Sequence, residues 1–148
     1  MLVIISDLHL GDGTTADSIS PSAFRLFARR LTETARFASL RRDGGYRPIE
    51  SLDVLLMGDI LDPLHSARWL DTSSSDTNYI RPWSDTSSPA YAAKLLEVTN
   101  AILNHNDEAM QILRRLASGE EIRLAPANSK GEADFQSTEQ LPLKVRFH

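Results

Sequence analysis

The chain has 148 residues, of which 41% are hydrophobic and 24% are charged, the size and composition of a single globular domain spanning residues 1–148. Its formal net charge is -4 and its arginines are scattered, so nucleic acid is not expected as a partner. The absence of cysteine excludes disulfides and thiolate metal sites and favours a cytoplasmic location. The apolar run at residues 1–5 is too short for a signal peptide or a membrane span.

The first strand and the first helix are predicted from local patterns. A continuous apolar run at residues 2–6 predicts a strand that is covered on both faces. Ser20 and Pro21 match the capping residue and the first position of a helix. Apolar residues then recur at helical spacing as far as Ala38, and we expect the helix to end before Gly44.

The rest of the chain repeats this order of elements. Residues 52–57, LDVLLM, predict a second strand, and residues 88–117 are expected to be helical with an interruption at Asn106 or Asp107. Residues 122–125 predict a short third strand. Because strands and helices alternate, we expect an α/β fold with a parallel-stranded sheet and flanking helices.

A long polar segment, residues 63–88, interrupts this alternation. It is rich in Ser, Thr and Asp, carries Trp69, Tyr79 and Trp83, and has no periodic pattern. Loops of this length are usually either disordered or functional. Two interpretations stay open, a solvated surface loop or a lid that carries aromatic contacts to a substrate.

Polar residues follow each of the three predicted strands. Asp7 and His9 come after the first strand, Gly58 and Asp59 after the second, and Asn128 after the third. Because parallel strands present their carboxyl ends along one edge of a sheet, we expect these residues to meet there.

This set of side chains suits divalent metal ions. In an extended backbone Asp7 and His9 would point to the same side and could chelate a metal that accepts mixed oxygen and nitrogen ligands, such as Mn, Fe, Zn, Ni or Co. Gly58 would allow a close approach of the backbone, so that the Asp59 carboxylate could bridge two cations. Asp62 would orient one of the ligands from behind. A pair of divalent ions held in this way binds phosphate groups.

The stretches SDLHLGDG and MGDILD resemble the first two blocks of the calcineurin-like metallophosphoesterases, in which D-x-H is followed by G-D-x-x-D and then by G-N-H-D/E. They are also similar to bacterial members related to UDP-2,3-diacylglucosamine hydrolases. The resemblance implies a four-layer α/β/β/α sandwich, of which this chain would form the N-terminal half. It further implies a dinuclear phosphoesterase in which Asp7 and His9 bind one metal, Asp59 bridges both and Asn128 offers its amide oxygen to the second.

The third family block is altered in this chain. Where the family has G-N-H-D/E, residues 126–130 read PANSK, so Ser129 stands at the position of the catalytic histidine and Lys130 at that of the acid. Ser129 cannot act as a general acid near neutral pH. Lys130 either adds a positive charge beside the cations or stabilises a phosphate oxyanion. The catalytic group is therefore unassigned, and the second metal site has an incomplete set of ligands.

The other histidines are not expected to bind metal. His65 lies in the polar segment and His105 at the predicted helix break, where surface and capping roles are more common than ligation. His148 is at the end of the sequence, where residues usually fray. It follows residues 143–147, which predict one further strand.

Three interpretations of function follow. The first is a metal-dependent enzyme that hydrolyses a phosphomonoester, a phosphodiester or a pyrophosphate. It would act either with an incomplete site or as part of a longer protein or an oligomer that supplies the missing ligands. The second is a catalytically impaired member of the same fold that serves as a binding module. The third is a fragment without independent activity, whose exposed sheet edge would favour association with other chains.

Overall fold

The computed structural model describes residues 1–77 and 79–148. The elements follow in the order β1 (Leu2–Ser6), α1 (Pro21–Ala38), β2 (Ser51–Met57), the short 3-10 helix η1 (Ala67–Leu70), α2 (Pro89–His105), α3 (Asp107–Ser118), β3 (Arg123–Leu124), β4 (Leu141–Pro142) and β5 (Lys144–Phe147). They belong to two compact units. The sheet unit comprises Met1–Ile5, Ser20–Met57 and Glu108–His148, and the α2 unit comprises Ser6–Ile19 and Gly58–Asp107.

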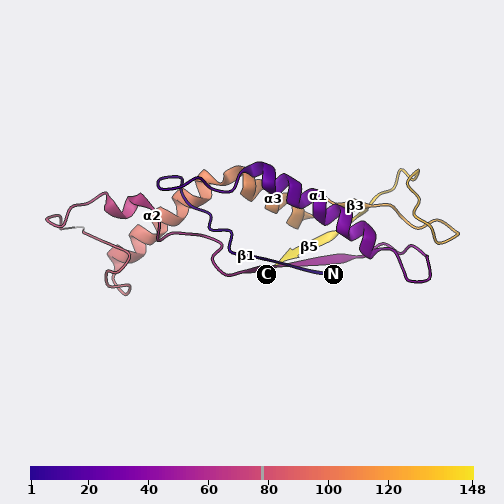
Figure 1. Cartoon of the computed structure of the whole chain (residues 1–148), viewed down its shortest axis with the longest axis horizontal. Helices are drawn as coiled ribbons and strands as arrows, with labels where there is room; N and C mark the ends of the chain where they lie inside the picture. The colour runs from indigo at the N-terminus through magenta and orange to yellow at the C-terminus, as the bar shows by residue number, and fades with distance from the viewer. Residues whose placement is uncertain (78) are drawn as a thin grey trace. The chain divides into compact units, whose positions relative to one another are not determined.

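The sheet unit contains a three-stranded parallel sheet in the order β1-β2-β5 (Figure 1). β2 and β5 are paired from Ser51 opposite Lys144 to Val54 opposite Phe147. Val54 and Val145 are almost completely buried, as the side chains of a covered sheet face should be. The predicted α/β class with parallel strands and flanking helices is confirmed.

The third strand of this sheet is β5, and not the strand predicted at residues 122–125. β3 pairs in antiparallel fashion with β4 in a separate two-stranded sheet. Ile122 and Leu124 are nevertheless buried. A short apolar run indicates burial but does not select a partner strand, and this explains why the prediction placed residues 122–125 in the wrong sheet. The further strand predicted at residues 143–147 is confirmed as β5.

The first helix begins where the sequence predicts. Ser20 caps α1 by accepting a hydrogen bond from the backbone N–H of Ser22 at 3.3 Å, and Pro21 occupies its first turn. The buried side chains of α1 recur at helical spacing, and they are Phe24, Ala28, Leu31 and Ala35. The helix ends at Ala38, and the chain then turns through Gly44, whose φ is +84°.

Helices cover one face of the parallel sheet. In Figure 1, α1 and α3 lie on the same side of the three strands, and an ion pair between Arg25 and Glu108 joins the two helices. Leu2 and Ile4 of β1 are 61% and 56% exposed. The expectation that β1 is covered on both faces is therefore wrong, because an apolar run reports two-sided burial only where layers lie on both sides of the sheet.

In the α2 unit the helix break is where the sequence predicts. Ser88 caps α2 by accepting from the N–H of Tyr91 at 3.1 Å, and α2 ends at His105. The amide of Asn106 donates to the backbone oxygens of Gly11 and Ile102, each at 2.8 Å. These bonds use the side chain of Asn106 to close the helix. None of the described helices combines the length and the apolarity that a membrane span requires.

The polar segment 63–88 contains a short helix and buried side chains, which the sequence did not predict. It contains η1, in which Trp69 is only 2% exposed, and Arg81 is 8% exposed. Residue 78 lies outside the described part of the chain. The purely solvated interpretation therefore does not hold for Trp69 and Arg81, and the lid stays a prediction.

Candidate functional site

Asp7 and His9 follow β1 in a left-handed backbone conformation. Their φ angles are +56° and +45°. In the described part of the chain, Asp7 and His9 are the residues other than glycine that have a positive φ. The extended backbone assumed for this pair is therefore wrong. A left-handed residue other than glycine costs about 1–2 kcal/mol, and such strain is concentrated at functional sites. The N–H of His9 donates to the carbonyl oxygen of Asp59 at 2.9 Å, which helps to hold the turn.

The Asp7 carboxylate lies against the chain that follows β2. Its Oδ1 accepts from the N–H of Asp59 at 3.4 Å. Gly58, with a φ of +68°, leaves the space that this carboxylate occupies, because a Cβ at Gly58 would lie 2.2 Å from Asp7 Oδ1. Hydrogen bonds from the Ser6 side chain and the Asp59 N–H lower the pKa of Asp7. The structure thus brings Asp7, Gly58 and Asp59 together.

Asp62 lies between two imidazole rings. Its Oδ2 is 2.7 Å from His65 Nδ1 and 3.6 Å from His9 Nδ1. The Asp62 side chain is 17% exposed, whereas those of His9 and His65 are 52% and 80% exposed. Burial acts to raise the pKa of Asp62, but the hydrogen bonds and charge of His65 and the charge of His9 outweigh it and lower the pKa. The 3.6 Å separation from His9 is longer than a hydrogen bond, so the predicted role of Asp62 in orienting a ligand stays a prediction.

His65 is the functional candidate that the sequence analysis missed. It belongs to the same cluster as His9 and Asp62, although a surface role was expected for it. The signal in the sequence is its position three residues after Asp62 in the run DPLH. This spacing brings the two side chains together in a turn, but a turn of this kind cannot be told from an ordinary surface loop without the segment that packs against it.

That segment begins at Asp12, the second acid of SDLHLGDG. The Asp12 carboxylate accepts from the hydroxyls of Thr14 and Ser66, each at 2.6 Å, and from Arg68 Nε at 3.1 Å. Thr15 adds a hydrogen bond from its hydroxyl to the carbonyl oxygen of His65 at 2.5 Å. Asp12 therefore serves the structure, because it ties its own loop to the chain that directly follows His65.

The carboxylate and imidazole groups line a cavity of about 400 Å³. Its walls lie entirely within the α2 unit and are formed by His9, Gly11, Thr15, Ala16, Asp17, Asp62 and His65. The volume falls within the range of about 300–1,000 Å³ that is typical of small-molecule sites. The cavity offers a small ligand two imidazoles and two carboxylates.

Asn128 belongs to the sheet unit and not to the α2 unit. Its side-chain oxygen, the atom expected to face a metal, accepts from the N–H groups of Lys130 and Glu132, each at 2.9 Å. The stretch 126–130 that contains Ser129 follows β3, which is not part of the parallel sheet. The reason given for placing Asn128 at the edge of that sheet is therefore wrong, and its role as a ligand stays a prediction.

The two remaining histidines have structural contacts. The His105 ring packs against Gly13, where a Cβ would lie 2.5 Å from its Cε1 atom. Gly13 has a φ of +76°, so both its conformation and its surroundings require glycine. His148 lies in the sheet unit, where its Nε2 is 3.1 Å from Asp53 Oδ1.

The donor groups and their spacing decide how well a metal ion fits this site. In the described part of the chain, no three or more His, Asp or Glu side chains are close enough together to hold a metal ion. The donor types nevertheless suit one, since Asp7 and His9 offer oxygen and nitrogen and the absence of a side chain at Gly58 lets the Asp7 carboxylate lie beside Asp59. The donor chemistry fits a divalent ion, whereas the spacing of the side chains does not yet form a complete ligand set.

Comparison with known proteins yields no match. No family model, no curated protein and no solved structure matches this chain. Its function has therefore to be argued from the geometry of the α2 unit and from the sequence motifs.

Proposed function

We propose that this chain is a metal-dependent phosphoesterase of the calcineurin-like type, acting on a phosphomonoester, a phosphodiester or a pyrophosphate. The single observation that carries the proposal is the packing of the Asp7 carboxylate into the space left by Gly58, next to the backbone of Asp59. Two segments that are 52 residues apart in sequence meet at this point, and each brings an acid that follows a strand.

The charges of the site support a role for cations. Asp17 and Asp62 line the 400 Å³ cavity, and no lysine or arginine is part of its described lining. Carboxylates in this position would repel a phosphate ester. Because divalent ions held by Asp7, His9 and Asp59 would reverse the sign of the local charge, they would make the cavity a site for anions.

Each residue of the candidate site would have a defined role in the proposed reaction. Asp7, His9 and Asp59 would hold the ions, and Asp62 would fix the ring of His9 and the ring of His65. The chemistry that bound divalent ions supply to such a site is neutralisation of phosphate charge and activation of water. His65, whose side chain is 80% exposed at the cavity, would offer an N–H to a phosphate oxygen.

The proposal includes the finer architecture of the family, a four-layer α/β/β/α sandwich. It is supported by the apolar side chains that β1 leaves exposed, Leu2 and Ile4, on a sheet whose described helices lie on one side. A second sheet packing on that face would bury them.

The test combines metal binding with hydrolysis. We expect Mn²⁺ to bind in calorimetry and to be required for hydrolysis of bis-p-nitrophenyl phosphate or p-nitrophenyl phosphate. Asp59→Asn is expected to abolish the metal-dependent activity without changing helix content in circular dichroism. The matched control is Asp71→Asn, which alters an acid of the same unit that pairs with Lys94 on the surface and should leave the activity unchanged.

Two results would contradict the proposal. One is the absence of Mn²⁺ binding, and the other is an Asp59→Asn variant as active as the wild type. Binding of Mn²⁺ without turnover of either ester would favour the binding module instead.

A further inference from the structure

A second cavity, of about 230 Å³, lies beside His65 in the α2 unit. Its larger apolar lining residues are Leu64, Trp69, Leu70, Pro82 and Trp83. Three of these large side chains are open to solvent, since Leu64 is 61%, Leu70 67% and Trp83 77% exposed. Apolar groups gathered around one hollow mark a surface that is suited to an apolar ligand.

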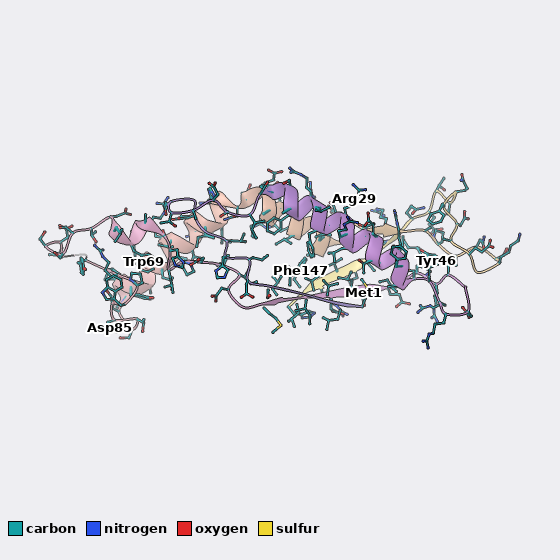
Figure 2. The ribbon with its side chains drawn as sticks, viewed as in Figure 1. Met1, Arg29, Tyr46, Trp69, Asp85 and Phe147 are labelled. Atoms are coloured by element: carbon teal, nitrogen blue, oxygen red, sulfur yellow. The ribbon has the colours of Figure 1, made fainter. Side chains whose placement is uncertain are left out.

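The inner wall of this apolar pocket is held firmly. Trp69 is 2% exposed, and its indole N–H donates to the carbonyl oxygen of Pro63 at 2.6 Å. Its ring centroid lies 5.7 Å from that of Tyr91, so that Trp69 packs beside α2 (Figure 2). The Arg81 guanidinium donates to the carbonyl oxygens of Trp69 and Thr72. Arg81 therefore holds the buried wall around Trp69 together, and the exposed ring of Trp83 is the aromatic surface that the pocket offers to a ligand.

The apolar pocket adjoins the polar cavity of the candidate site. Thr15 and His65 line both of them. The Thr15 hydroxyl donates a hydrogen bond to the His65 carbonyl oxygen, so the two residues that the cavities share are also bonded to each other. A ligand with its phosphoryl group beside His9 and Asp62 would therefore extend past His65 toward Leu64 and the two tryptophans.

We propose that this pocket binds the organic group of the phosphate ester, and that this group is a flat aromatic ring system. The inference rests on the proposed function for its phosphoryl end. A volume of about 230 Å³ is smaller than a whole small-molecule site, typically about 300–1,000 Å³, and suits one ring system better than a pair of lipid chains. Tryptophan faces stack on flat rings more favourably than on flexible chains, because stacking adds to the burial of area.

The chain offers its own optical probe for this binding. Its two tryptophans, Trp69 and Trp83, both line the apolar pocket, so tryptophan fluorescence reports on that pocket. The full-length chain would be titrated with benzylphosphonate, methylphosphonate and octylphosphonate, which are not hydrolysed, in Mn²⁺ and in EDTA. We expect benzylphosphonate to quench the fluorescence and to bind about tenfold more tightly than methylphosphonate.

Substitutions inside and outside the apolar pocket test whether the preference for the benzyl group arises there. Trp83→Ala and Leu64→Ala change exposed side chains and are expected to remove the preference for the benzyl group. Phe135→Ala and Leu96→Ala are matched controls, because these side chains are 72% and 60% exposed outside the pocket, and the preference should be kept. For hydrolysis of p-nitrophenyl phosphate, Trp83→Ala should raise KM about tenfold with little change in kcat.

The outcomes separate this inference from the proposed function. Hydrolysis that is unaffected by Trp83→Ala and Leu64→Ala would overturn the aromatic pocket and leave the phosphoesterase standing. A benzyl preference in EDTA without any hydrolysis would support the pocket and count against the phosphoesterase. Tighter binding of octylphosphonate than of benzylphosphonate would overturn the assignment of a flat ring.

Discussion

The Asp7 carboxylate occupies the space in which Gly58 would carry a side chain, since a Cβ at Gly58 would come within 2.2 Å of Asp7 Oδ1. Gly58→Ala should therefore displace the carboxylate and weaken Mn²⁺ binding by at least about tenfold. It should also lower the free energy of unfolding by about 1–2 kcal/mol, because alanine is strained at a φ of +68°. Calorimetry with Mn²⁺ and denaturant unfolding measure the two effects.

Gly44→Ala is the control for this substitution. Gly44 has a φ of +84°, and a Cβ at this position would meet nothing within 4 Å, so the alanine carries the same backbone strain without the steric contact. The two variants should lose similar stability, but only Gly58→Ala should lose metal affinity. Equal Mn²⁺ affinities in both variants would rule out a metal role for the Asp7–Gly58 contact.

Asp62 is expected to act through His9 and His65. Asp62→Asn should reduce Mn²⁺ affinity or activity by about 10–100-fold, the usual effect of removing a group that orients a metal ligand. The loss should be smaller than in Asp59→Asn, which removes a proposed ligand itself. The measurement is Mn²⁺-dependent hydrolysis of p-nitrophenyl phosphate, and an Asp62→Asn variant with wild-type kinetics would contradict the orienting role.

Asp12 should make the stability of the protein depend on pH. Burial acts to raise the pKa of Asp12, but hydrogen bonds from Ser66 and Thr14 and the charge of Arg68 hold the pKa below its usual value. A carboxylate with a lowered pKa in the folded state stabilises the protein above the unfolded pKa of about 4, and this contribution is lost as the pH falls through the folded value.

Asp12→Asn tests this dependence. At pH 7 the variant should be less stable by about 2–4 kcal/mol, because it replaces a buried acceptor of several hydrogen bonds by an amide that also carries donors. The difference from the wild type should shrink below about pH 4. Asp71→Asn, at an exposed position, should change stability by less than about 0.5 kcal/mol in the same denaturant series. A difference for Asp12→Asn that does not vary with pH would exclude the ionised carboxylate as the cause.

Gly13 and His105 should show coupled effects on stability. A Cβ at Gly13 would lie 2.5 Å from His105 Cε1, so Gly13→Ala adds a steric contact to the strain of a positive φ. His105→Ala removes the ring, and the double variant should therefore recover about 1 kcal/mol relative to the sum of the single losses. Denaturant unfolding of the three variants measures this coupling. If the losses in unfolding free energy are additive, the His105 ring can move away from the new Cβ without destabilising the protein.

Local features account for the parts of the fold that the sequence predicted well. Ser20 with Pro21, and Ser88 with the proline after it, mark the starts of α1 and α2 because a capping hydrogen bond joins residues two or three apart. The apolar runs of β1 and β2 locate those strands for a similar reason. Such signals are complete within a few residues, and the fold class follows from their alternation.

The sequence by itself therefore determined the positions of β1, β2, β5 and the three α-helices, the α/β class and the chemical types of the candidate ligands. Only the tertiary structure decided that β5 completes the parallel sheet, that Asp7 and His9 adopt left-handed conformations, and that His65 joins His9 through Asp62. Each of these depends on a contact between segments that are distant along the chain, and pairing, strain and packing across such distances leave no pattern within a short stretch of sequence.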